Sequence, residues 1–201
     1  EAQLERSTGE NEASDEPTDE EQIEFLSRMF NPSPAQLLEA AKNCELSYAT
    51  PSAYPDGRYL SPAAVEKIGL EPDEVELLRR SLDGSRDRWV EQLRSIYVDA
   101  TGDESGAGEL SEAAMQAEVL SKAVHEDLVD SRERVVKERA GMLPAPARGD
   151  GSPVERFYRQ QLERSADVYS AVTEAVGEDR AYSVLGSLRM NMANYRDCSD
   201  G

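Results

Sequence analysis

Apolar residues recur along much of this chain at three- and four-residue spacing, the period of an α-helix that buries one face. Three long stretches show this period, over residues 72–100, 111–141 and 153–176. In the first, the predicted face consists of Val75, Leu78, Leu82, Trp89, Leu93 and Ile96. In the second, it consists of Ala113, Ala117, Leu120, Val124 and Leu128. In the third, it consists of Val154, Tyr158, Leu162, Tyr169, Val172 and Val176. The second pattern slips near His125, where a break is predicted.

Proline marks the start of several predicted helices. It follows a residue that suits a helix cap at four places, Ser33-Pro34, Ser61-Pro62, Glu71-Pro72 and Ser152-Pro153. Proline fits the first helical position because the N–H that it lacks would be unpaired there, and its φ already suits a helix. Gln36 and Glu155 lie three residues after two of the serines, which predicts capping boxes.

Shorter helices are predicted over residues 18–30, 34–46, 62–68 and 178–190. Thr18 with Glu21 predicts a cap for the first, whose expected face is Ile23, Leu26 and Phe30. Gly69 is expected to end the third in a left-handed conformation. Residues 47–60 lack a helical period and are expected to form an ordered loop, and residues 102–109 a glycine-rich turn. No strand pattern competes, so the sequence predicts an all-α fold, a helical bundle with three long helices and several short ones.

The N-terminal end of the chain is much more acidic than the rest. The first 24 residues hold ten Asp or Glu against the single Arg6. A segment with dense like charge and few apolar residues cannot offset the entropy of ordering. Residues 1–17 are therefore expected to form a disordered acidic tail or linker, and residues 18–201 a single helical domain.

The whole chain has a formal net charge of −19. Nucleic acid and anionic lipid surfaces need a basic face, so neither is expected as a partner. No apolar run is long enough to span a membrane. The chain starts at Glu1, from which we expect a processed product whose acidic segment tethers it to a removed signal sequence or anchor.

Two cysteines are present, Cys44 and Cys198. Cys44 falls in the predicted helix 34–46, and Cys198 in a polar C-terminal stretch. They form a disulfide between the tail and an early helix in one interpretation, which favours an extracytoplasmic location because pairing protects an exposed thiol in an oxidising space. In the other interpretation they are two unrelated free thiols.

Candidate chemistry is sparse. The single histidine, His125, has no helical Glu-x-x-His partner, so it is interpreted as a surface residue, and no catalytic residue, metal or cofactor is expected. Tyr48, Tyr54 and Tyr59 crowd the predicted loop. They either pack over the bundle or form an amphipathic surface that binds a partner.

Two segments fifty residues apart share a pattern. Leu60-Ser61-Pro62-Ala63-Ala64 and Leu110-Ser111-Glu112-Ala113-Ala114 resemble the Leu-Thr-x-x-Gln motif of the Spy/CpxP family, with Ala where that family has Gln. The segment 69–97 is also similar to the long helices of that family. The resemblance covers about residues 60–140 and implies a periplasmic helical protein that acts as a chaperone, stress sensor or metal-response accessory.

Together these features favour a non-enzymatic, extracytoplasmic and bacterial helical domain that is tethered at its N-terminus and acts by protein contact. Its acidic surface favours basic or unfolded protein partners. A cytosolic regulatory or adaptor domain with reduced thiols is the alternative. An enzyme that relies on carboxylates alone is the third hypothesis.

Overall fold

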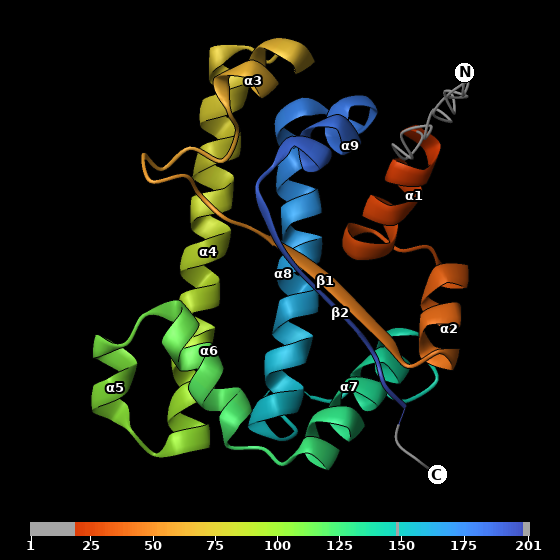
Figure 1. Ribbon diagram of the computed structural model, residues 1–201, viewed down its shortest axis with the longest axis vertical. Helices are drawn as coiled ribbons and strands as arrows, with labels where there is room; N and C mark the ends of the chain where they lie inside the picture. Colours follow the sequence, from red (N-terminus) through yellow and green to blue (C-terminus); the bar gives the residue numbers. More distant parts are fainter. Residues whose placement is uncertain (1–18, 148, 199–201) are drawn as a thin grey trace, which may run out of the picture.

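Two long helices form the spine of the fold in the computed structural model, which describes residues 19–147 and 149–198. Helices α4 (Pro72–Thr101) and α8 (Pro153–Val176) lie side by side (Figure 1). The long stretch predicted over residues 111–141 is divided into α6 (Glu112–Ser121) and α7 (His125–Arg139), at the break predicted near His125. The other helices are α1 (Asp19–Phe30), α2 (Pro34–Lys42), α3 (Pro62–Ile68), α5 (Glu104–Glu109) and α9 (Glu178–Ser187). The predicted all-α class is confirmed. The predicted acidic tail and the Thr18 cap lie outside the described residues.

Helix starts follow the proline signals. Helices α2, α3, α4 and α8 begin at the four prolines. The Ser33 hydroxyl accepts the Gln36 N–H at 3.3 Å, and the Ser152 hydroxyl accepts the Glu155 N–H at 3.2 Å. Both predicted capping boxes are complete, which satisfies N–H groups that have no partner inside the helix. Gly69 ends α3 with φ 71°, the left-handed cap expected from sequence.

Two segments pair as strands. The expectation that the chain contains no strands is therefore wrong for these two segments. Strand β1 (Glu45–Pro51) pairs antiparallel with β2 (Met190–Arg196). Helix α2 therefore stops at Lys42 instead of residue 46, and α9 stops at Ser187 instead of residue 190. Cys44, with φ 50°, turns the chain from α2 into β1. The inter-strand ladder satisfies backbone groups of both segments, including residues 45, 46 and 190, which were predicted to end helices.

The core has two parts that share α4 and α8. The upper part in Figure 1 includes Leu26, Phe30, Leu78, Leu82, Val172 and Leu185. The lower part includes Trp89, Leu93, Ile96, Met115, Val119, Phe157 and Tyr158. Trp89 and Phe157 meet edge to face, with ring centroids 5.8 Å apart. Such aromatic pairs bury large apolar areas with a favourable geometry.

Three predicted details are wrong. Helix α6 buries Met115 and Val119 instead of the predicted alanine face, because the larger side chains remove more apolar surface from water. Val124 and Ile23, both predicted to share apolar faces, are exposed. The predicted turn over residues 102–109 contains the short helix α5, which Asp103 caps by accepting the Gly106 N–H at 2.9 Å.

Candidate protein-contact site

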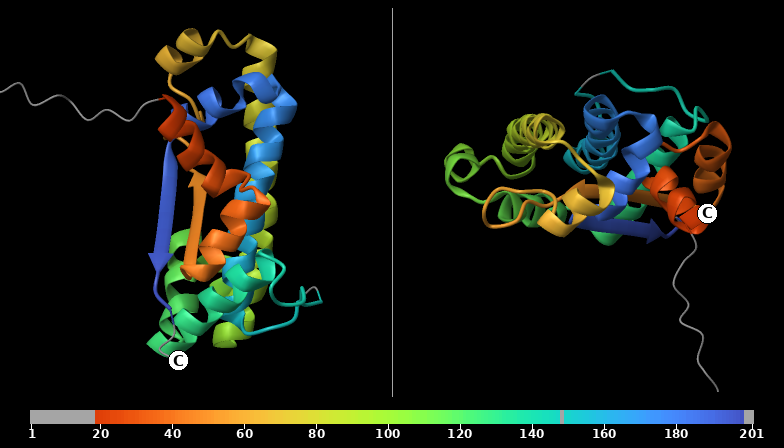
Figure 2. Two further views of the ribbon diagram at one scale, coloured as in Figure 1. Left: turned by 90° about the vertical axis from the view of Figure 1, so that its right-hand side faces the viewer. Right: turned by 90° about the horizontal axis from the view of Figure 1, so that it is seen from above.

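The two-stranded sheet stands out from the helices. In both views of Figure 2, β2 lies at the outside of the molecule, with β1 between it and α8. The inner strand is held by Ser165 of α8, whose hydroxyl donates to the Ala49 carbonyl at 2.9 Å and accepts the Ala49 N–H at 3.1 Å. Within the described residues the sheet has only these two strands. The outer edge of β2 is therefore a row of backbone groups without a strand partner.

One side of β2 anchors it to the lower core. Tyr195 packs against Tyr158, with ring centroids 5.9 Å apart, and against Tyr48 at 6.4 Å. The guanidinium of Arg132 lies over the Tyr195 ring, 4.6 Å from its centroid. This buried arginine also pairs with Asp197 at 3.1 Å. These contacts fix β2 on its inner side, while Asn191, Met192, Asn194 and Arg196 remain exposed.

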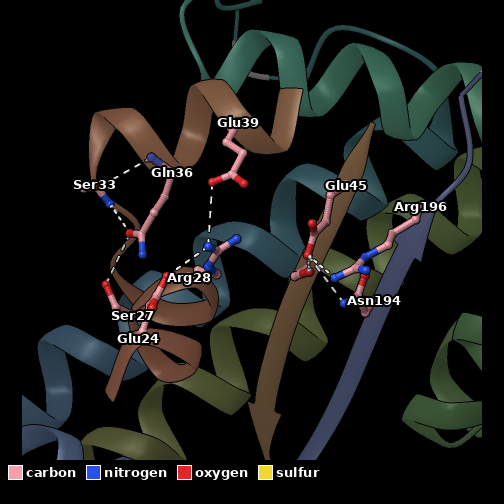
Figure 3. Close-up of polar contacts among 10 residues, drawn as sticks. Glu24, Ser27, Arg28, Ser33, Gln36, Glu39, Glu45, Asn194 and Arg196 are labelled. Atoms are coloured by element: carbon pink, nitrogen blue, oxygen red, sulfur yellow. Dashed lines mark hydrogen bonds and ion pairs between the residues drawn. The ribbon is translucent and has the colours of Figure 1, made fainter. Parts of the chain in front are cut away.

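Glu45 fixes the register at the far end of the sheet (Figure 3). Its carboxylate accepts hydrogen bonds from Ser47 at 3.3 Å, Asn194 at 3.5 Å and Arg196 at 3.4 Å. A one-residue slip would carry Asn194 and Arg196 to the opposite face of the sheet, away from Glu45. Cross-strand contacts therefore oppose any shift of β2 along β1.

Arg28 joins α1 to α2 beside this end of the sheet (Figure 3). Its guanidinium lies 2.9 Å from the Glu24 carboxylate and 3.7 Å from that of Glu39. The hydrogen bond to Glu24 raises the pKa of Arg28 above its ordinary value. The three side chains are partly exposed, so the pairs contribute modestly to stability and serve to orient the two helices.

The predicted disulfide is confirmed. Cys44 and Cys198 are bonded, with their Cα atoms 5.2 Å apart and a sequence separation of 154. Cys44 directly precedes β1, and Cys198 follows β2 by two residues. The bond therefore ties together the end of the sheet at which Glu45 and Arg196 meet.

The three tyrosines singled out from sequence do not form a common exposed surface. Tyr48 and Tyr59 are buried, in different parts of the core, and Tyr54 is partly buried. Tyr59 donates to the Asp83 carboxylate at 3.0 Å, and burial raises its pKa to about 12. The guanidinium of Arg189 lies 5.9 Å from the Tyr54 ring centroid. The rings therefore pack over the bundle. Partner binding by these tyrosines stays a prediction, because the three rings do not share one exposed surface.

The structure also places the histidine that was considered for catalysis or metal binding. His125 is exposed at the first position of α7, as predicted. Over residues 19–147 and 149–198, no group of three or more His, Cys, Asp or Glu side chains is arranged to hold a metal ion. No helix in that part of the chain is both long enough and apolar enough to cross a membrane.

Comparison with known proteins gives no relative. No protein-family model, no curated protein and no solved structure matches this chain. The resemblance to the Spy/CpxP family therefore stays an expectation from the two motif-like segments.

Proposed function

We propose that this protein is a binding domain that recognises an extended segment of a partner protein by adding it as a strand to β2. The outer edge of β2 is the observation that carries the proposal. Strand addition uses main-chain hydrogen bonds for affinity and alternate side chains for specificity. The exposed Met192 offers an apolar contact at the centre of this edge.

Edge strands in soluble proteins are usually protected against such pairing by proline, charged side chains, bulges or a covering element. Strand β2 contains no proline or lysine, its charged residue Arg196 is paired with Glu45, and its seven pairs with β1 run without interruption. Asn194 and Arg196 are satisfied from within the sheet by Glu45, so they leave the outer backbone groups free. An unprotected edge of this length favours a role in pairing with another chain.

Charge indicates the kind of partner. With a net charge of −19, the protein attracts basic chains over long range and repels acidic ones. A second copy of the chain carries the same charge, which disfavours self-pairing. An extended segment that carries lysine or arginine therefore suits this surface best.

The disulfide supports an oxidising, extracytoplasmic compartment, because structural disulfides persist there and are rare in a reducing cytosol. The acidic N-terminal segment would tether the domain in that compartment. We therefore propose a contact role outside the cytoplasm, without a chemical step.

Site-specific photocrosslinking tests the contact. A photoreactive side chain in place of Met192 should capture a partner in the cell envelope, whereas the same group in place of the exposed Arg94 of α4 should not. With the purified partner, amide exchange should slow in residues 190–196, since added strands protect edge amides. Capture at both positions alike, or protection confined to the α4–α8 side, would contradict strand addition.

A further inference from the structure

A cavity of about 750 Å³ opens between α4, α7 and α8. Ala145, Pro146, Ala147, Gly149 and Asp150 line it from the segment that joins α7 to α8. Figure 2 shows the segment that joins α7 to α8 standing away from the helices. The volume falls in the range typical of sites for small organic ligands, about 300–1,000 Å³.

The lining has an apolar floor. Ile96, Val135 and Leu162 are buried and come from three different helices. Ala145 and Pro146 add apolar surface on the loop side. The floor side chains are already shielded, so a ligand with a hydrocarbon body would mainly remove the exposed surface of Ala145 and Pro146 from water.

Two of the arginines that line the cavity already have carboxylate partners. Arg159 of α8 pairs in bidentate fashion with Glu138 of α7, at 2.7 and 3.0 Å. Arg156 of α8 lies 2.8 Å from Asp99 of α4. The Nε atom of Arg156 is buried and has no hydrogen-bond partner among the described residues.

Arg139 is different, because no hydrogen bond or ion pair within residues 19–147 and 149–198 involves its guanidinium. It lies partly buried at the end of α7 and lines the cavity. Burial lowers the pKa of Arg139 from its ordinary value, and no nearby carboxylate opposes that effect. An unpaired charge that is held away from water is costly, and an anion beside it removes that cost.

We propose that this cavity binds an organic anion with a single carboxylate and an apolar body, the carboxylate lying against Arg139 and the body on the floor. Glu138 and Asp99 pair with Arg159 and Arg156, so within the described residues Arg139 is the lining arginine without a carboxylate partner, and one carboxylate would complete its pairing. The exposed carboxylates of Asp150 and Glu163 at the rim disfavour a doubly charged phosphate.

Calorimetric titration with octanoate is the direct test. The comparison ligands are 1-octanol, which lacks the carboxylate, and acetate, which lacks the long hydrocarbon chain. Octanoate should bind saturably, and 1-octanol and acetate at least about tenfold more weakly. Arg139→Gln should weaken octanoate binding by about tenfold or more, since it removes a charge-assisted contact. The matched change Arg94→Gln, at an exposed position of α4 outside the cavity, should leave binding unchanged.

Two further measurements show where octanoate binds and whether the variant is folded. Methyl NMR signals of Ile96, Val135 and Leu162 should shift with octanoate at the same concentrations that give heat. In the absence of ligand, Arg139→Gln should melt no lower than the parent protein, because it removes an unpaired partly buried charge, and this establishes that the variant is folded.

Three results would overturn the proposal. They are no saturable binding of octanoate up to about 3 mM, equal binding of octanoate and 1-octanol, or equal affinity of Arg139→Gln and the parent. Tighter binding of inorganic phosphate than of octanoate would also reject it, in favour of a phosphate site. None of these outcomes depends on β2, so they leave the strand-addition proposal to its own test.

Discussion

Glu112 joins three helices, and its replacement by Ala should destabilise the fold by about 3–5 kcal/mol. It is the first residue of α6, and its carboxylate accepts from Trp89 Nε1 of α4 at 2.8 Å and from Arg164 of α8 at 3.0 Å. The Arg164 side chain is only 7% exposed, and its burial lowers the pKa of the guanidinium. Without Glu112, this buried charge and the indole N–H both lose their acceptor.

The magnitude follows from what remains after the change. Removing one partner of a buried pair leaves an uncompensated charge, which costs about 3–5 kcal/mol. The unpaired Trp89 N–H belongs to the same network, so its cost of about 1–3 kcal/mol does not simply add. The Glu112 side chain is 23% exposed, which admits water, so a value towards the lower end is expected.

Urea unfolding provides the assay, because Trp89 is the single tryptophan and lies in the lower core. Far-UV circular dichroism should give the same midpoint. Glu112→Gln keeps an acceptor for Trp89 and should cost less than Glu112→Ala. Glu109→Ala, at an exposed position just before α6, should change stability by no more than about 0.5 kcal/mol. A loss below about 1 kcal/mol for Glu112→Ala would refute the account of this network.

Three other predictions concern residues already discussed. Replacing both Cys44 and Cys198 by Ser should lower the free energy of unfolding by up to about 5 kcal/mol, because the long loop that the disulfide closes is released. By mass spectrometry, the parent chain should weigh two hydrogens less than its reduced form. The pKa of Tyr59, raised by burial to about 12, favours the neutral phenol in the folded state. Its contribution to stability is therefore complete below pH 10 and is lost between pH 10 and 12, and Tyr59→Phe should flatten this alkaline fall in a pH series of urea midpoints. His125→Ala should change the urea midpoint by the equivalent of no more than about 0.5 kcal/mol, and a larger shift would show a contact that its exposure does not indicate.

Helix boundaries were predictable where a backbone constraint sits in the sequence. Proline at the first helical position and glycine at the end act locally, so the predicted starts at Pro62 and Pro153 and the predicted stop at Gly69 are confirmed. Which side of a helix is buried depends on its neighbours. In α6 the alanine stripe was equally consistent with burial, and only packing on Trp89 and its surroundings selects Met115.

The sheet could not be predicted for a different reason. Strand β1 alternates between polar and apolar residues only over its first four positions, and its last three residues are buried on both faces, so the two-residue period is too short to predict a strand. Strand β2 is largely exposed and owes its conformation to partners far away in sequence, Glu45 among them. The candidate contact edge and the Arg139 cavity depend on these long-range arrangements, so neither carried a signal in the sequence.

The separation of β1 and β2 in the sequence affects how the chain folds during translation. About 140 residues separate the two strands at their nearest ends. At translation rates of about 5–20 residues per second, β1 waits roughly 7–28 s for its partner, while α4 and α8 are completed in between. During that time Ser165, once α8 has emerged, can bond the Ala49 backbone, while the β1 backbone groups that pair with β2 lack their partners. A chain that stopped at residue 189 would keep the residues of its helices and expose β1 as a bare edge, so residues 190–196 protect the finished protein from aggregation.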